Sequence, residues 1–177
     1  MKSIIETKRL ILRELKPSDV EGMYALDSNA DVHAYLGNTP VKTREESQQT
    51  IKFIREQYKE NGIARFAVID KQTNSFMGWC GLKYESDLRI DKSYYDIGYR
   101  LRKRYWGGGV ATEAAIACLN YGFSHMNLTE ISGAAHTQNI ASNIILRKIG
   151  LTFVETFAYK GIVLNWYTIT QDQWLNR

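Results

Sequence analysis

The chain reads Arg104-Tyr105-Trp106-Gly107-Gly108-Gly109 between a strand-like and a helix-like segment. Residues 94–101 have the pattern of a strand. The positions after the glycines that share one helical face are Ala111, Ala114, Ala115, Cys118, Leu119 and Gly122. A helix begins with amides that lack partners, its dipole makes that end electropositive, and glycines leave those amides open to an anion. The pattern predicts a phosphate or pyrophosphate site over residues 107–111, with a tight turn that binds nothing as the alternative.

Two common phosphate loops do not fit this segment. A Walker loop ends in Gly-Lys-Ser/Thr, whereas Gly109 is followed by Val110-Ala111-Thr112. A dinucleotide fingerprint needs a third glycine in Gly-x-Gly-x-x-Gly and an acid about 20 residues later; the third glycine is missing and only Glu130 offers an acid. Hydrolysis of a nucleoside triphosphate and binding of a dinucleotide are therefore disfavoured.

Patterning along the rest of the chain indicates one domain over residues 1–177. Besides residues 94–101, strands are expected at residues 9–13, 65–70, 76–84, 130–135, 152–158 and 162–170. Helices are expected after Pro17, over residues 43–61 behind a Thr43–Glu46 capping box, after the glycines, at residues 141–149 and after Thr170, with a possible short helix at 31–36. This order is typical of an α/β (α+β) protein with helices on both faces of a mixed sheet.

Composition limits the class of protein. Hydrophobic residues make up 44% of the 177 residues and only 2 residues are proline, which favours a globular domain over a disordered chain. Cys80 and Cys118 lie far apart without CxxC spacing, which argues against a disulfide scaffold or a zinc cluster. The start of the chain lacks a signal-peptide pattern and no apolar run could span a membrane, so a cytoplasmic protein is expected. The net charge of +4 is mild and suits an anionic cofactor.

The glycine run matches (Arg/Gln)-x-x-Gly-x-(Gly/Ala), and through it the chain resembles the GNAT N-acetyltransferase superfamily, whose loop of this form binds the pyrophosphate of acyl-CoA. Neighbouring stretches narrow the resemblance to the RimJ/RimL-type branch. They are Thr7-Lys8-Arg9-Leu10-Ile11-Leu12-Arg13, Ile97-Gly98-Tyr99, Ala111-Thr112-Glu113-Ala114, Asn139-Ile140-Ala141-Ser142 and Lys148-Ile149-Gly150-Leu151. These motifs occur in order, and residues 9–170 can be aligned with the family's order of elements without a large gap.

The resemblance implies a twisted, mostly antiparallel sheet of about seven strands, with the strands at residues 96–101 and 130–135 splayed apart. Acetyl-CoA is the implied cosubstrate, and its pantetheine arm would bond to backbone groups near Ile97, Tyr99 and Leu101. The implied pyrophosphate site is the loop of Gly107, Gly108, Gly109, Val110 and Ala111, with Arg104 as a nearby cation. Asn139 and Ser142 would face the pantetheine arm and the thioester.

The chemistry that the resemblance implies needs a base, because an amine is protonated near neutral pH and must lose a proton before it attacks. Asp96 is the implied base or water-positioning carboxylate; the alternative is a salt-bridged or solvated acid. Aspartate is one methylene shorter than the glutamate common in the family, which favours a water relay. The family's usual acid, a tyrosine, is replaced by Leu146. Ser142 is the candidate donor to the leaving sulfur, unless it only satisfies an amide of its helix.

The acceptor expected from the resemblance is a primary amine, either a peptide N-terminus or a small molecule. Trp79 and Tyr159 are the first candidates for substrate binding, ahead of Tyr35, Tyr84, Tyr95 and Trp166, most of which are expected in the core. His33, His125 and His136 lack the spacing of metal ligands, so no metal is expected.

Two other classes of function compete with the enzyme. A non-catalytic acyl-CoA-binding module is the main alternative, since the tyrosine is missing and the carboxylate is short. A nucleic-acid-binding domain is disfavoured, because the dense basic run at residues 100–104 adjoins the glycine loop and is interpreted as attraction for cofactor phosphates. No membrane partner is expected, and both a monomer and a homodimer are compatible with the sequence.

Overall fold

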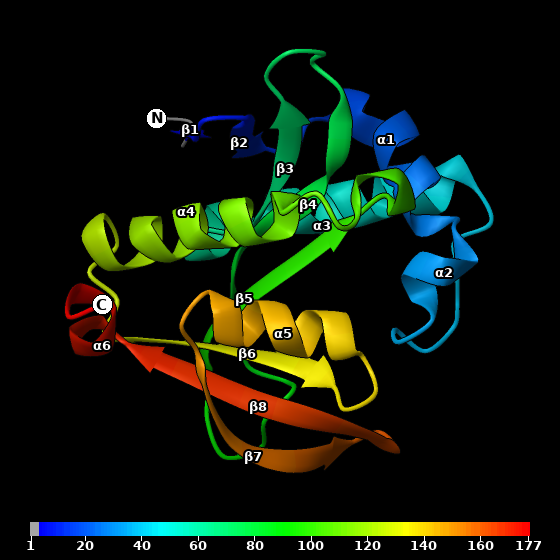
Figure 1. Cartoon of the computed structure of the whole chain (residues 1–177). Coiled ribbons are helices and arrows are strands. Elements are labelled where there is room, and N and C mark those ends of the chain that lie inside the picture. The colour runs from blue at the N-terminus through cyan, green and yellow to red at the C-terminus, as the bar shows by residue number, and fades with distance from the viewer. Residues whose placement is uncertain (1–3) are drawn as a thin grey trace.

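An eight-stranded sheet forms the centre of the structure, a computed structural model that describes residues 4–177 (Figure 1). Its strands are β1 (Ile4–Glu6), β2 (Leu10–Glu14), β3 (Arg65–Asp70), β4 (Phe76–Glu85), β5 (Tyr94–Leu101), β6 (Glu130–His136), β7 (Thr152–Tyr159) and β8 (Ile162–Thr170). They lie in the order β1-β2-β3-β4-β5-β6-β8-β7, and only the β5–β6 pair is parallel. The expected mixed, mostly antiparallel sheet is confirmed.

The N-terminal edge strand β1 adds an eighth strand to the seven expected. Ile4 pairs with Arg13 and Glu6 with Ile11, so the chain turns back on itself directly before β2. Three residues are too few for an alternating pattern to stand out in a sequence. Residues 1–3, part of the stretch assessed for a signal peptide, lie outside the described residues.

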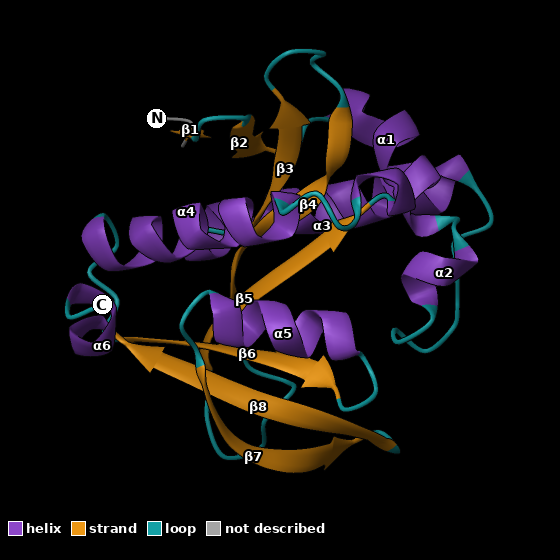
Figure 2. Cartoon of the chain, in the orientation of Figure 1, coloured by secondary structure: helices purple, strands orange, loops and turns teal. Residues whose placement is uncertain are grey.

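Helices cover both faces of the sheet, as expected (Figure 2). On one face lie α4 (Val110–Ser124) and α5 (Ile140–Lys148); on the other lie α1 (Val20–Asp27) and α3 (Arg44–Asn61). The shorter helical elements are η1 (Pro17–Asp19), α2 (Ala30–His33), η2 (Lys103–Tyr105) and α6 (Gln171–Leu175). Alternate residues of a strand point to opposite faces. Phe66 and Val68 therefore belong to the core under α4, whereas Ala67 and Ile69 pack with α1 and α3.

Capping decides where α3 begins and ends, and one half of the expected capping box is wrong. The Thr43 hydroxyl accepts a hydrogen bond from the Glu46 amide at 3.3 Å, as predicted. The Glu46 carboxylate, however, accepts from the Lys42 amide at 2.7 Å rather than from Thr43. Gly62 ends the helix with a φ of 71°, a left-handed conformation that glycine adopts without steric cost.

Cys80 and Cys118 are both buried and both free, on β4 and α4. Their sulfur atoms lie 3.9 Å apart where the helix packs on the sheet. The two thiols fill space between strand and helix as small apolar groups do.

Candidate functional site

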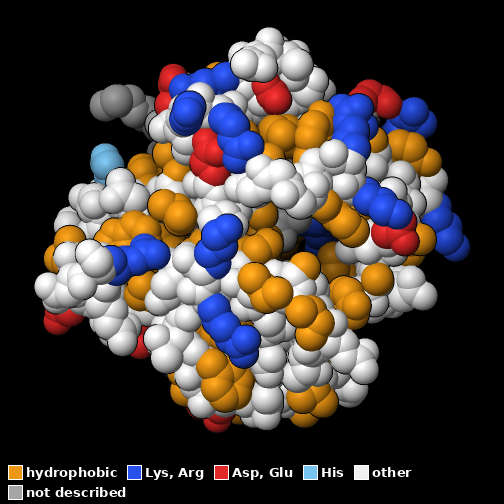
Figure 3. Space-filling view, viewed as in Figure 1, with side chains coloured by type: hydrophobic (Ala, Val, Ile, Leu, Met, Phe, Trp, Pro, Cys, Tyr) orange, Lys and Arg blue, Asp and Glu red, His pale blue; other side chains and the backbone are white. Residues whose placement is uncertain are grey.

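The parallel strands β5 and β6 separate toward their C-terminal ends. Asp96 and Ser132 are the one residue pair that joins them in register, although β5 has 8 residues and β6 has 7. A parallel pair normally bonds along its whole shared length. The backbone of β5 beyond Asp96 therefore lacks a full ladder on its β6 side, and the expected splay is confirmed. Figure 3 shows the surface hollowed between α4 and α5 above this opening.

Three residues of β5 were expected to offer backbone groups here: Ile97, Tyr99 and Leu101. All three lie beyond the Asp96–Ser132 pair, in the diverging part of the strand. The Leu101 carbonyl already accepts a hydrogen bond from the indole of Trp106 at 2.8 Å. That contact fixes the start of the glycine loop against the end of the strand.

Tyr99 connects the two arms of the opening through its side chain. Its phenol donates a hydrogen bond to the backbone carbonyl of Ser142, at 3.0 Å, in the first turn of α5. Burial raises the pKa of Tyr99, so the phenol stays protonated at neutral pH. The side chain of Tyr99 therefore joins β5 to the helix that follows β6.

The glycine loop leads from β5 into α4 with its backbone exposed. Gly107 and Gly109 both have a φ of 75°, a conformation that costs other residues about 1–2 kcal/mol. Gly109 is the N-cap of α4 and has no side chain with which to cap it. The first helical bond runs from the Glu113 amide to the Gly109 carbonyl, which leaves the amides of Val110 and Ala111 directed out of the helix. The loop therefore presents open backbone amides at the positive end of a helix, the arrangement that an anion requires.

Arg9 and Glu113 hold this loop from the side of β2. The Arg9 guanidinium donates to the Gly108 carbonyl at 2.9 Å and to the Glu113 carboxylate at 2.6 Å. The same carboxylate accepts from the hydroxyl of Thr7 at 2.6 Å. Burial raises the pKa of Glu113, but the hydrogen bonds from Thr7 and Arg9 outweigh it and leave that pKa below its usual range. The guanidinium of Arg9 and the first turn of α4, which Glu113 holds in place, therefore lie beside the amides of the loop.

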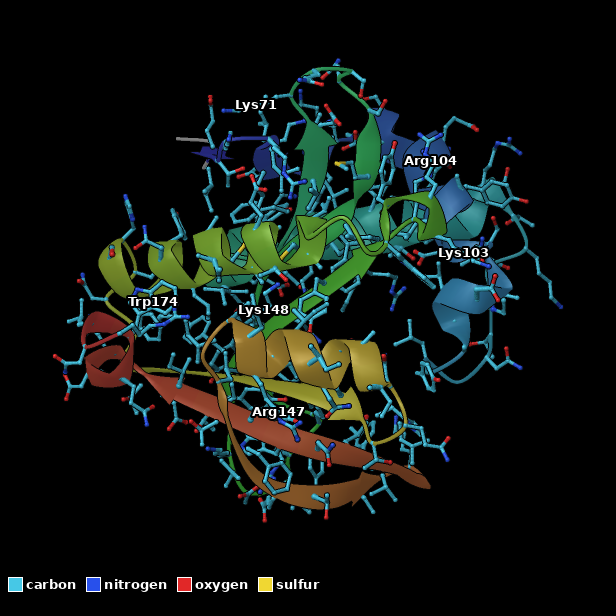
Figure 4. The ribbon with its side chains drawn as sticks, in the orientation of Figure 1. Lys71, Lys103, Arg104, Arg147, Lys148 and Trp174 are labelled. Carbon is cyan, nitrogen blue, oxygen red and sulfur yellow. The ribbon has the colours of Figure 1, made fainter. Side chains whose placement is uncertain are left out.

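Arg104 lies at the edge of the molecule where the chain approaches α4, beside Lys103 (Figure 4). Its guanidinium lies 4.7 Å from the centre of the Tyr105 ring. Lys103 pairs with Asp31 at 2.7 Å, whereas Arg104 has no carboxylate partner within residues 4–177. The positive charge of Arg104 is therefore free to attract a phosphate.

Asp96 lies on the opposite face of the sheet from α4 and forms an ion pair with Arg65 of β3. Arg65 crosses β4 at Gly81 and lies over Gly98, where an added Cβ would come within 2.7 Å of the guanidinium. Arg65 also donates to the backbone carbonyls of Gly81 and Asp96. The Asp96 side chain is 14% exposed, and burial raises its pKa above the usual range although Arg65 opposes the rise. A carboxylate held in this way is a stronger base than an exposed aspartate.

Residues 9–152 match the model of the acetyltransferase (GNAT) domain family, which is most of the chain. The chain belongs to the GNAT acetyltransferase family. It is 31% identical over 147 residues to the uncharacterized N-acetyltransferase YoaA of Bacillus subtilis, a match that covers 83% of this chain and 81% of YoaA. Relatives of the chain carry the name N-acetyltransferase, and the GNAT domain is a transferase domain, so the chain is an N-acetyltransferase.

Solved GNAT structures have the same fold. An acetyltransferase (GNAT family) from Bacillus anthracis superposes with a TM-score of 0.82 at 26% identity, over 96% of this chain and 99% of the other. RimL, a ribosomal alpha-N-protein acetyltransferase in complex with coenzyme A, superposes with a TM-score of 0.80 at 20% identity, over 97% and 99% of the two chains. The latter likeness concerns the fold alone.

The first turn of α5 carries the two polar residues expected near the thioester. The Asn139 side chain accepts from the Ser142 amide at 3.2 Å and caps the helix. Its oxygen is therefore engaged within the protein, whereas the Ser142 hydroxyl has no hydrogen bond within the described residues. Leu146, at the position of the family's tyrosine, is 2% exposed and would lie within 2.9 Å of a Cβ added at Gly133.

Trp79 and Tyr159, the candidates for acceptor binding, lie on separate parts of the sheet. Trp79 on β4 has the guanidinium groups of Arg65 and Arg100 at 5.4 and 5.0 Å from its ring. Tyr159 ends β7, which lies beyond β5, β6 and β8 from β4, and contacts Lys160 at 5.1 Å. Of these two candidates, only Trp79 shares a neighbour with Asp96, because Arg65 contacts both side chains.

Arg65 and Arg9 are residues of the site whose roles were not predicted from the sequence. Arg65 begins a strand that is otherwise almost wholly apolar, and a charged residue among buried positions is itself a signal, because charges are buried only when paired. Arg9 was interpreted only as part of the first strand.

Within residues 4–177 no group of three or more His, Cys, Asp or Glu side chains is placed to hold a metal ion. None of the helices in this part of the chain is long and apolar enough to cross a membrane.

Proposed function

We propose that the chain transfers the acetyl group of acetyl-CoA to a primary amine, with residues 1–177 acting as one acetyltransferase domain. The observation that carries the proposal is the divergence of β5 and β6 from a single Asp96–Ser132 pair, with an open glycine loop at its wide end and a paired carboxylate at its apex. The long, thin pantetheine arm needs such a gap, and its diphosphate needs unpaired amides at one end of it.

Binding of acetyl-CoA, which supplies the acetyl thioester, involves both sides of the gap. The amides of Gly107, Gly109, Val110 and Ala111 would hold the diphosphate, next to the backbone of Gly108, with Arg104 as an additional cation. Backbone groups of Ile97 and Tyr99 would hold the pantetheine arm along β5. Leu101 contributes its amide rather than its carbonyl, which Trp106 occupies. Asn139 and Ser142 would lie beside the arm at the start of α5.

A protonated amine must lose two protons during the transfer, one before it attacks and one as the tetrahedral intermediate collapses. The protonated amine gives a proton to Asp96 through a water, because the carboxylate is short and already held by Arg65. The amine nitrogen then forms a bond with the acetyl carbon, and a backbone amide of β5 stabilises the oxyanion of the tetrahedral intermediate. The carbon–sulfur bond breaks as that intermediate collapses, and the nitrogen loses its second proton to solvent. The leaving thiolate takes a proton from Ser142, which solvent then reprotonates, or directly from solvent. The products are an N-acetylated amine and free coenzyme A.

The acceptor class that we propose is a peptide N-terminus or a small amine. Motifs of the RimJ/RimL type support it, and RimL itself, a structural neighbour, acts on a protein N-terminus. Trp79, flanked by Arg65 and Arg100, is the proposed acceptor contact nearest to Asp96, and Tyr159 at the β7–β8 turn is a second one. The proposed location of the enzyme is the cytoplasm, as a monomer or a homodimer.

Release of the coenzyme A thiol across a panel of amines tests this function. The panel includes peptides that begin with serine or alanine, together with small polyamines and aminoglycosides. Calorimetry with acetyl-CoA is run in parallel. Turnover of any amine above the hydrolysis of acetyl-CoA supports the enzyme. Tight binding of acetyl-CoA without turnover of any amine would favour a non-catalytic acyl-CoA-binding module, for which Leu146 at the usual tyrosine position is the argument.

A further inference from the structure

Two buried hydroxyl groups lie behind Asp96 at the apex of the opening. Ser132 is 0% exposed and Tyr94 is 7% exposed, and neither the Ser132 hydroxyl nor the Tyr94 phenol has a hydrogen-bond partner within residues 4–177. Buried polar groups are nearly always hydrogen-bonded, since a buried unpaired one costs about 1–3 kcal/mol. The two unpaired hydroxyl groups beside the Asp96 carboxylate therefore need a physical explanation.

Both hydroxyl groups share the face of the sheet on which Asp96 lies. Ser132 is the direct register partner of Asp96 on the neighbouring strand, and side chains of register partners point to the same face. Tyr94 precedes Asp96 by two residues on β5, and its ring meets Trp166 of β8 at 4.5 Å, on that same face. Adjacent strands lie about 4.8 Å apart, a separation that one water bridges with two hydrogen bonds.

Aromatic and cationic side chains pack around the Tyr94 ring. The Arg89 guanidinium lies 5.1 Å from the Trp166 ring and 4.9 Å from that of Phe157. Trp166 in turn holds the Tyr94 ring edge-on at 4.5 Å. Trp166 therefore packs directly against the Tyr94 ring, which is 7% exposed.

We propose that Ser132, together with Tyr94, is a positioning residue that holds the proton-carrying water against Asp96. The inference rests on the proposed function and deepens it. The water accepts one proton from the protonated amine and gives one of its own protons to the Asp96 carboxylate, so its composition is unchanged. The Ser132 and Tyr94 hydroxyls supply the remaining hydrogen bonds that keep it in place, since a buried water needs two to four polar partners. The serine across the apex thus compensates for the methylene that aspartate lacks relative to glutamate.

Several charged and titratable groups around Asp96 influence its pKa. Arg65 faces it from β3, Lys83 and Glu85 from β4, and Tyr94 from its own strand. Lys83 and Glu85 are paired with each other at 2.7 Å. Removing a donor to the ionised carboxylate, such as the Ser132 hydroxyl acting through the water, raises the pKa of Asp96.

The test combines Ser132→Ala with Asp96→Glu, and uses Thr168→Val as the matched control. Thr168 pairs with Ser132 from β8 and carries a hydroxyl one strand further from Asp96. Ser132→Ala is expected to lower kcat by about 10- to 100-fold, less than the roughly 100- to 10,000-fold that a general base itself contributes, while the Kd of acetyl-CoA stays constant. In the Asp96→Glu background the longer carboxylate reaches the amine without the water, so there Ser132→Ala should change kcat less than about threefold. Thr168→Val should leave kcat unchanged.

An NMR titration of the Asp96 carboxyl group separates this proposal from the proposed function, because it needs no acceptor. Ser132→Ala should raise the pKa of Asp96, and Tyr94→Phe, which keeps the ring on Trp166, should raise it too. The proposal is overturned if Ser132→Ala and Thr168→Val have the same effect on kcat, or if neither hydroxyl deletion moves the titration of Asp96. A wild-type protein that titrates as expected but acetylates no amine would overturn the proposed function instead.

Discussion

Arg65 reaches from β3 across β4 to the carboxylate of Asp96 on β5 and also donates to the Asp96 backbone carbonyl. Gly98 leaves the space in which its guanidinium lies. The pair therefore fixes both the side chain and the backbone at the apex of the opening. It also balances the burial that raises the pKa of Asp96.

Replacing Arg65 by methionine should impair transfer more than binding. The variant loses the cation that lowers the pKa of Asp96, so that pKa rises and the acid limb of the pH profile of kcat/KM moves to higher pH. We expect kcat at neutral pH to fall by about 100-fold, with an unchanged Kd for acetyl-CoA by calorimetry. Arg65→Lys, which keeps the charge, should move the acid limb less. An acid limb that stays in place in both variants would remove Asp96 from the role of base.

Gly109→Ala should weaken the binding of acetyl-CoA through the backbone alone. The φ of 75° costs an alanine about 1–2 kcal/mol, which the loop relieves by moving its amides. Gly161, in the β7–β8 turn, has a φ of 81° and nothing within 4 Å of an added Cβ, so Gly161→Ala is a control with the same strain at a distance. Calorimetry should show weaker binding of acetyl-CoA for Gly109→Ala and unchanged binding for Gly161→Ala. Equal affinities in the two variants would contradict the diphosphate site.

Arg100→Met should destabilise the fold. Arg100 donates to the carboxylate of Asp27 at 2.7 Å, and that carboxylate is 3% exposed. The variant removes this cation and leaves the buried carboxylate beside His33, whose Nε2 lies 3.4 Å away. We expect the free energy of unfolding in urea to fall by about 3 kcal/mol. The double variant Arg100→Met/Asp27→Asn should recover part of that loss. Similar stabilities for the single variant and the wild type would show that the pair contributes nothing.

The Glu113 carboxylate should make stability depend on pH. Its pKa in the folded protein lies below the usual value, so its contribution is present above about pH 4.3 and is lost as the pH falls through the folded pKa. Glu113→Gln should lower the free energy of unfolding at pH 7 by about 1–2 kcal/mol, through its bonds to Thr7 and Arg9. Denaturation series at pH 7 and pH 3 measure the difference. A gap between variant and wild type that is equally large at both pH values would contradict this role.

The sequence predicted what depends on local pattern and missed what depends on distant contacts. The bounds of β3, β5 and β8 were predicted to the residue, because runs rich in β-branched, aromatic and apolar residues end there at turn or loop residues. The glycine loop was found because backbone conformation selects glycine at Gly107 and Gly109. Arg65 and Ser132 were not found, since an arginine becomes a partner of Asp96 only once β3, β4 and β5 are side by side. Register between β5 and β6 carries no signal in a single sequence.

NMR of the backbone amides of the labelled protein, recorded while coenzyme A is added, tests the diphosphate site in the glycine loop directly. The largest shifts should occur at Gly107, Gly109, Val110 and Ala111, with further shifts along β5 from Ile97 to Leu101. Shifts that leave residues 107–111 unchanged and cluster elsewhere would contradict this site.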